Sequence, residues 1–107
     1  MNVLTFDVEE WFHVRFDNEF LDNSKLIDSF EKRLDRNMKI ILDLLDGYNQ
    51  KATFFCLGWV ARRYPHIIKE IDARGHEIGC HSDLHKLLYN FSIDQFEDDL
   101  LSAISSI

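Results

Sequence analysis

The chain has 107 residues, enough for one domain at most, and 46% of them are hydrophobic, so it can bury a core and is not expected to be disordered. Its 12 basic and 19 acidic residues give a net charge of −7. This charge argues against nucleic-acid binding, because the sequence has no basic stripe to pair with phosphates.

The first predicted element is a short apolar strand over residues 3–6, which ends directly in Asp7-Val8-Glu9. At an extended strand end, the side chains of Asp7 and Glu9 point to one side and that of Val8 to the other. An irregular polar stretch is expected to follow, roughly from residue 14 to residue 23.

A helix comes next. Asp28 followed by Glu31 has the spacing of a capping box, which predicts that the helix starts there, and Gly47 lies where a C-terminal glycine belongs. Between them, apolar residues recur at steps of four and three, which is one helical face. This face consists of Phe30, Leu34, Met38, Ile41 and Leu45. Residues 52–57, with β-branched and aromatic side chains, predict a second buried strand.

The third part of the chain repeats this alternation. Gly58 is expected to open a helix whose main segment begins at Pro65, because proline fits the first helical position. Residues 77–80 predict a third strand, and Ser92 with Gln95 forms a capping box. The apolar face of that last helix would consist of Phe96, Leu100 and Ile104. The order βαβαβα predicts an α/β fold with parallel strands and right-handed crossovers.

Three strands with their helices are less than half of a (β/α) barrel. The sequence ends inside a helical pattern, so we expect residues 1–107 to be the N-terminal part of a larger domain. The third strand would have an open edge with unpaired backbone groups, and we expect self-association through that edge. No apolar stretch approaches the roughly 18 residues of a membrane span. The first residues lack the basic region of a secretory signal, so the expected location is cytoplasmic.

His81 and His85 directly follow the third strand and are four residues apart. On a helical turn, two such side chains lie on one face with Cβ atoms about 5–6 Å apart. Both rings can then reach one metal ion at roughly 2.0–2.1 Å. A lone histidine is more often exposed or hydrogen-bonded, but this spacing at a strand end favours a metal site. Because the carboxyl ends of parallel strands meet at one edge, Asp7 is expected beside the pair.

Other polar residues have simpler interpretations. His76 is expected to play a structural role in the turn before the third strand, and His66 to face water on its helix. His13 is either a loop histidine or an extra site residue, and Glu10 is either solvated or a support for a ligand. Asp83 is expected to project away from the histidine pair.

These motifs resemble the polysaccharide deacetylase family (carbohydrate esterase family four) over nearly the whole chain. Thr5-Phe6-Asp7 resembles the first family motif, and residues 75–85 resemble its metal motif, G-H-E-I-G-x-H-x-x-x-H. The family's common first motif is Thr-Phe-Asp-Asp-Gly, whereas here Val8 follows the first aspartate. The pattern D-V-E-[DE]-[WY]-F resembles a subgroup associated with exopolysaccharide loci.

The resemblance implies the N-terminal part of a distorted (β/α) barrel. It also implies a hydrolase that uses metal-activated water to remove acetyl groups from N-acetylated sugars of a polysaccharide or oligosaccharide. A divalent ion, with Zn²⁺ expected, would be held by His81, His85 and Glu9, and Asp7 would be the base. The family's general acid and its Arg-Pro-Tyr motif have no counterpart in this sequence, so the 107 residues alone are expected to be inactive. Two alternatives stay open: a metal-dependent amidohydrolase acting on a non-sugar amide, and an inactive metal-binding fragment.

Overall fold

The protein is built on a small parallel sheet. The computed structural model describes residues 1–14 and 23–107, so the irregular stretch expected at about 14–23 falls mostly outside the described residues. The strands pair in the order β1-β2-β3. They are β1 (Thr5–Val8), β2 (Thr53–Cys56) and β3 (Glu77–Cys80). The predicted α/β fold with parallel strands is therefore confirmed.

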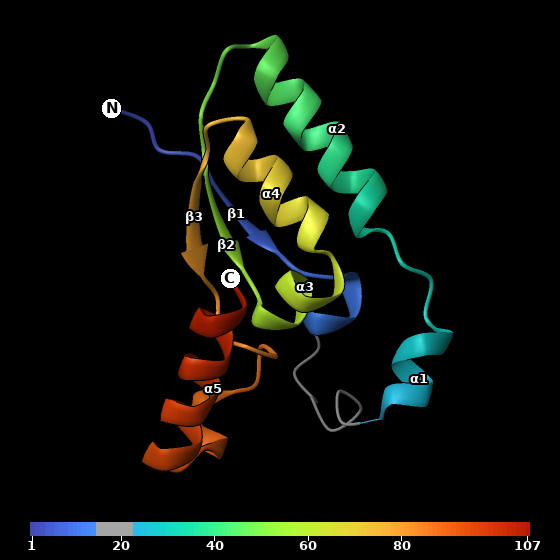
Figure 1. Cartoon of the computed structure of the whole chain (residues 1–107), viewed down its shortest axis with the longest axis vertical. Helices are drawn as coiled ribbons and strands as arrows, with labels where there is room; N and C mark the ends of the chain where they lie inside the picture. The colour runs from blue at the N-terminus through green and yellow to red at the C-terminus, as the bar shows by residue number, and fades with distance from the viewer. Residues whose placement is uncertain (15–22) are drawn as a thin grey trace.

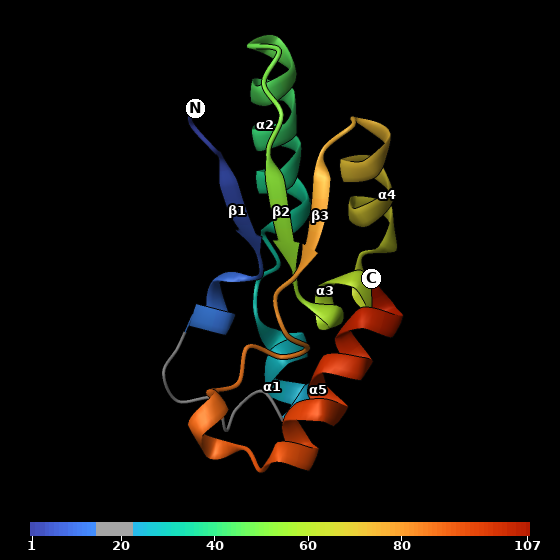
Figure 2. The same cartoon turned by 90° about the vertical axis from the view of Figure 1, so that its left-hand side faces the viewer.

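The helices occupy one face and one end of this sheet. They are α1 (Ser24–Ser29), α2 (Leu34–Gly47), α3 (Gly58–Arg63), α4 (Pro65–Ala73) and α5 (Ile93–Ser106), with two short 3-10 helices, η1 (Trp11–Val14) and η3 (Leu88–Asn90). Figure 1 shows α2 and α4 beside the strands. In Figure 2 both helices lie behind the sheet, while η1, α3 and α5 lie at the end to which the strands point. Within the described part of the chain, no helix is long and apolar enough to cross a membrane.

Alternation along the strands separates a buried face from an open one. Val8, Phe54 and Cys56 belong to the core, together with apolar side chains of α2 and α4 such as Met38 and Ile71. The side chains between them on the strands point to the other face of the sheet, as the twofold period of a strand requires. In Figure 2 no described helix covers that face.

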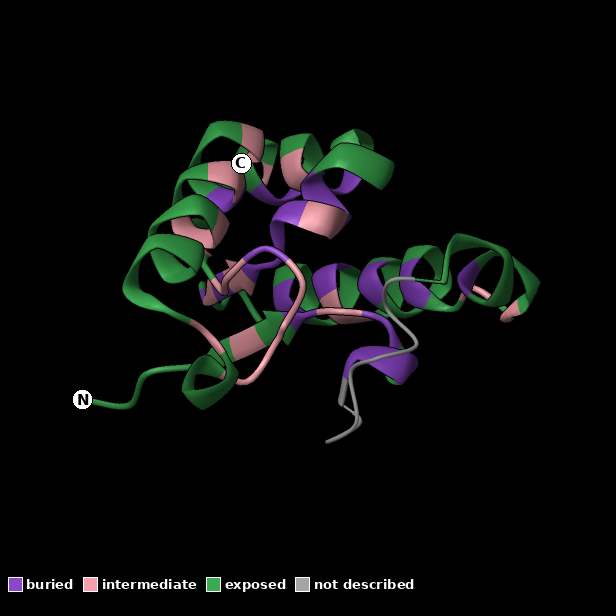
Figure 3. Cartoon of the chain, turned by 90° about the horizontal axis from the view of Figure 1, so that it is seen from below, coloured by how far each residue is buried: buried purple, intermediate pink, exposed green. Residues whose placement is uncertain are grey.

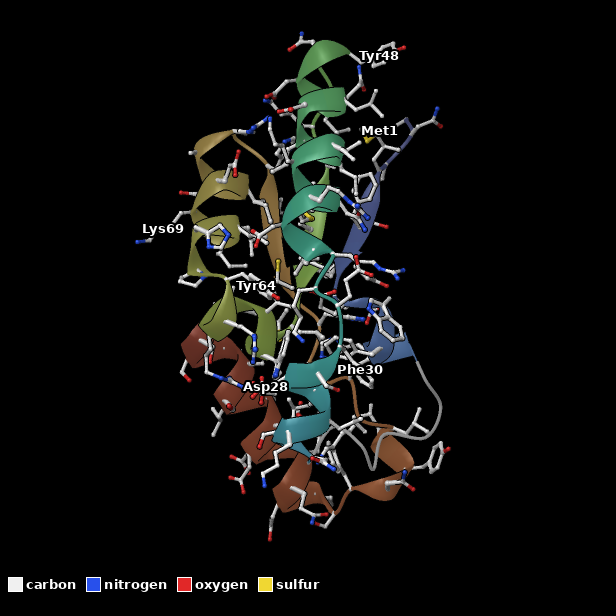
Figure 4. The ribbon with its side chains drawn as sticks, turned by 90° about the vertical axis from the view of Figure 1, so that its right-hand side faces the viewer. Met1, Asp28, Phe30, Tyr48, Tyr64 and Lys69 are labelled. Carbon is white, nitrogen blue, oxygen red and sulfur yellow. The ribbon has the colours of Figure 1, made fainter. Side chains whose placement is uncertain are left out.

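The first long helix starts later than predicted. Asp28 lies inside α1 and pairs with Arg63 at 2.9 Å, so the capping role predicted for Asp28 is wrong. Instead α2 begins at Leu34, and the carboxylate of Glu10 accepts its N–H at 3.3 Å and that of residue 33 at 3.1 Å. The cap therefore comes from a residue more than twenty positions upstream. Phe30, expected on this helix, lies in the connection before it (Figure 4).

The last helix begins where its capping box predicted but buries a different face. The Ser92 hydroxyl accepts the N–H of Gln95, and the Gln95 side chain accepts the N–H of Ser92. Ala103 is the buried residue of α5, whereas Phe96 and Ile104 are 41% and 57% exposed. The Cα atom of Ala103 lies against Gly58 of α3, and these two small residues let the helices approach closely.

Candidate metal centre

Glu9, His81 and His85 come together beyond the carboxyl ends of β1 and β3. One ligand-type atom of each lies within 4.8 Å of the others. The Glu9 Oε2 atom is 4.0 Å from Nε2 of His81 and 3.7 Å from Nε2 of His85. Asp7 is next to them, with its Oδ2 atom 3.8 Å from Nε2 of His81. The four residues singled out from the sequence thus share one site.

The two carboxylates at the end of β1 point to the same side of the sheet but differ in their exposure to solvent. Val8 is buried in the core, so Asp7 and Glu9 extend to the opposite side, as alternation predicted. The Glu9 side chain is only 14% exposed, whereas that of Asp7 is 55% exposed. Glu9 therefore faces the two imidazoles from a largely enclosed position, and Asp7 remains accessible to water or a substrate.

The two histidines do not lie on a helical turn, contrary to the prediction. Residues 81–87 are irregular, and Ser82 and His85 have φ values of 65° and 60°. These values lie in the left-handed region, which non-glycine residues seldom adopt. The two rings nevertheless meet, with centroids 5.0 Å apart. A loop rather than a helix face brings the ligands together.

The first turn of α3 holds this loop. The backbone N–H groups of Gly58 and Trp59 donate to the carbonyl oxygens of Ser82 and Asp83, at 3.0 and 3.1 Å. N–H groups in the first turn of a helix have no partner inside that helix, so they are available for such contacts. The Ser82 hydroxyl also accepts the N–H of His85 at 3.0 Å. Figure 3 looks onto this end of the sheet, where the loop is of mostly intermediate burial.

Asp83 has a structural role that the sequence did not reveal. It is buried, and its two carboxylate oxygens accept bonds from Arg62 at 2.6 and 2.9 Å. These bonds raise the pKa of the Arg62 guanidinium. The backbone N–H of Asp83 donates to the carboxylate of Asp99 of α5 at 3.0 Å. Asp83 lies outside the ligand cluster, as expected, but it joins the loop to both α3 and α5.

Two further residues support the site from the side of η1. The ring of His85 donates its Nδ1–H to the carbonyl oxygen of His13 at 2.8 Å, since a carbonyl can only accept. This leaves the lone pair of His85 on Nε2, the atom nearest Glu9. His13 is itself buried, and burial lowers its pKa to about 4. Glu10 is buried as well, not solvated.

These residues fit a divalent metal ion. Among the described residues, four buried side-chain atoms have no hydrogen-bond partner: Glu9 Oε2 and the Nε2 atoms of His81, His13 and His76. Of these, Glu9 Oε2 and His81 Nε2 face each other at 4.0 Å. Such atoms are costly unless something satisfies them. Two imidazoles and one carboxylate form the donor set of hydrolytic zinc sites. Ligand atoms around a tetrahedral ion with bonds of 2.0–2.1 Å would be roughly 3.3 Å apart. Glu9 Oε2 is 3.7 and 4.0 Å from the two Nε2 atoms, so the side chains would have to close by about 0.4–0.7 Å to bind such an ion.

A hollow of about 420 Å³ lies beside the candidate ligands. Its lining comes from the loop after β3, including His81 and His85, and from Phe96, Asp99 and Leu100 of α5. His76 and His66 lie away from this site. His76 is buried and accepts the N–H of Ala52, and His66 is exposed and pairs with Asp35, as their structural interpretations predicted.

Comparison with known proteins identifies the family and the fold. The polysaccharide deacetylase family model matches residues 3–107. A peptidoglycan-N-acetylglucosamine deacetylase of Bacillus cereus is 41% identical over 63 residues, which is 59% of this chain and 30% of that protein. Among solved structures, the Bc1960 peptidoglycan N-acetylglucosamine deacetylase superposes with a TM-score of 0.69 at 31% identity. The peptidoglycan deacetylase PdaC from Bacillus subtilis superposes with a TM-score of 0.68 at 26% identity.

Each superposition covers 97% of this chain, but only 38% of the Bc1960 structure and 40% of PdaC. The chain thus spans less than half of the proteins it resembles. Their distorted (β/α) barrel is the fold expected from the sequence, of which the three strands described here form a part. Because the family model matches nearly every residue, the chain belongs to the polysaccharide deacetylase family.

Proposed function

We propose that the protein is a metal-dependent hydrolase that removes acetyl groups from N-acetylated sugars of a polysaccharide or oligosaccharide. The observation that carries the proposal is the convergence of Glu9, His81 and His85 at one end of the sheet, with Asp7 beside them. The relatives named as peptidoglycan deacetylases support the class of substrate.

Glu9, His81 and His85 are the proposed metal ligands. Zn²⁺ is the proposed ion, because two histidines and one glutamate are a donor set of hydrolytic zinc sites. When bound, such an ion polarises a carbonyl oxygen and acidifies water. The largely enclosed Glu9 carboxylate would supply negative charge that offsets the charge of the bound ion.

Asp7 is the proposed base. Its carboxylate lies within 4 Å of a candidate ligand yet is more than half exposed, so it can contact both a water molecule and a substrate. Hydrolysis forms a bond from the water oxygen to the acetyl carbon and breaks the carbon–nitrogen bond. Asp7 takes the proton that the attacking water loses, and returning this proton to the leaving amine restores the Asp7 carboxylate.

The test separates the base from the ligand in the intact protein. Asp7→Asn should retain bound metal and lose about 10²–10⁴ in the rate of acetate release from an N-acetylated oligosaccharide. Glu9→Gln should bind metal more weakly, because a neutral amide replaces a charged ligand. Full metal content and activity in Glu9→Gln would remove Glu9 from the ligand set. Turnover of a linear amide without acetate release from the sugar would instead identify a different amidohydrolase.

A further inference from the structure

We infer that His13 is a positioning residue for the metal ligand His85, an inference that rests on the proposed metal site. The two residues are 72 positions apart in the chain, yet they are joined directly by a hydrogen bond of 2.8 Å between the His85 ring and the His13 carbonyl. A metal-binding histidine commonly donates its second ring nitrogen to such an acceptor, which fixes both its tautomer and the orientation of its ring.

The side chain of His13 holds that carbonyl in place. Its Nδ1 atom accepts the backbone N–H of Glu10 at 3.0 Å, while its own N–H donates to the Glu10 carbonyl at 2.9 Å. The ring is fully buried, with its centroid 4.7 Å from that of Phe12 and 4.8 Å from that of Trp59. Two hydrogen bonds therefore close the turn of η1, and the ring of His13 packs against two aromatic rings.

Glu10 connects this turn to the rest of the fold. Its buried carboxylate accepts the N–H of Leu34 at 3.3 Å, at the start of α2, and the hydroxyl of Tyr64 at 3.1 Å, at the junction of α3 and α4 (Figure 4). Glu10 also directly follows the candidate ligand Glu9 in the chain. The contacts of Glu10 and His13 thus fix Glu9 and His85 relative to one another.

The experiment compares matched variants of the intact protein, with Zn²⁺ affinity measured by chelator competition and unfolding measured without metal. His13→Phe keeps an aromatic ring but removes the acceptor for the Glu10 N–H, and it should weaken Zn²⁺ binding about 10–100-fold. His13→Asn places an amide oxygen near the position of Nδ1, and it should restore most of the lost affinity.

His76→Phe is the matched control. His76 is also buried, its Nδ1 also accepts a backbone N–H, from Ala52 at 3.2 Å, and its ring also packs against an aromatic residue. It precedes β3, at the opposite end of the sheet from the ligands. Removing its acceptor should lower stability without changing Zn²⁺ affinity. Equal losses of affinity in His13→Phe and His76→Phe would show a general effect of folding and overturn the inference.

A measurement on the unaltered protein keeps the inference testable if His13→Phe does not fold. Long-range ¹H–¹⁵N spectra of the zinc-loaded protein should show His85 protonated at Nδ1. A proton on Nε2 of His85 would overturn the role of the His13 carbonyl. The metal site itself is tested separately, because His81→Ala with His85→Ala removes zinc binding if the proposed function is right, whatever His13 does.

Discussion

Replacing Gly58 by alanine should disturb, from outside the candidate site, the loop that carries His81 and His85. A Cβ atom at position 58 would lie 2.2 Å from Oδ1 of Asp83 and 2.8 Å from the Cα atom of Ala103. Neither neighbour can move cheaply. The Asp83 carboxylate is bound by both terminal nitrogens of Arg62, and Ala103 is the buried backbone contact of α5.

Three contributions set the size of the effect. Forcing an extra methyl group into a packed contact costs about 1–3 kcal/mol. If the Asp83 carboxylate turns away instead, it loses charged hydrogen bonds worth about 1.5–3 kcal/mol. Alanine is favoured over glycine within a helix by roughly 0.5–1 kcal/mol, which offsets part of this loss. The net expectation on either route is a fall of roughly 0.5–2.5 kcal/mol in the free energy of unfolding.

Gly47→Ala provides the control, because Gly47 is also helical and a Cβ atom there would meet nothing within 4 Å. For Gly47→Ala only the helical preference of alanine over glycine matters, so this variant should be as stable as the parent protein or more stable by up to about 1 kcal/mol. Urea unfolding of both variants measures the difference. If Gly58→Ala differs from Gly47→Ala by less than about 0.5 kcal/mol, the usual scatter of surface substitutions, the reasoning about this contact is refuted.

Three further outcomes are expected. Glu10→Ala should lower the free energy of unfolding by about 2–4 kcal/mol, because α2 loses its cap and the Tyr64 hydroxyl loses a partner. Glu10→Gln should lower it less, and equal urea midpoints for the two variants would contradict this reasoning. Zn²⁺ at a hundredfold excess over its dissociation constant should stabilise the parent protein by about 2.7 kcal/mol in a thermal unfolding assay but leave the variant with His81→Ala and His85→Ala unchanged. Burial lowers the pKa of His76, so the contribution of its neutral ring to stability is complete above about pH 6.5. This contribution is lost as the pH falls, because only the unfolded chain then takes up the proton. The free energy of unfolding of His76→Phe should therefore decline less steeply toward acid pH than that of the parent protein, by at most about 1.4 kcal/mol per pH unit.

The elements that the sequence predicted well are those with local causes. Residues 77–80 are the third strand as expected, and β2 lies within the predicted range 52–57. Pro65 begins α4, and Gly75, with a φ of 75°, follows its end. A capping box or a helix-starting proline acts through neighbours within four residues, so the sequence alone contains the whole interaction.

The features that the sequence missed have distant causes. The Asp28 cap failed because a carboxylate from another segment occupies the N-terminus of α2 five residues later. The helical turn expected around His81 failed because the loop carbonyls of Ser82 and Asp83 bond to α3 instead of to their own chain neighbours. The spacing of apolar residues indicates which face of an element is buried. It gives no information about backbone groups that form hydrogen bonds with a distant segment.

The features that the sequence did not predict lie around the proposed metal site, and the geometry of such a site explains why. Ligands from two strands converge only if the chain leaves each strand irregularly, and an irregular backbone leaves polar groups that must be satisfied from outside. Here buried partners satisfy them: the carboxylate of Glu10, the carbonyl of His13 and the pair of Arg62 with Asp83. A residue of this kind sets the ligand geometry without being a ligand itself. Substitutions of these residues should therefore change the metal affinity of the proposed site, although none of them is a proposed ligand.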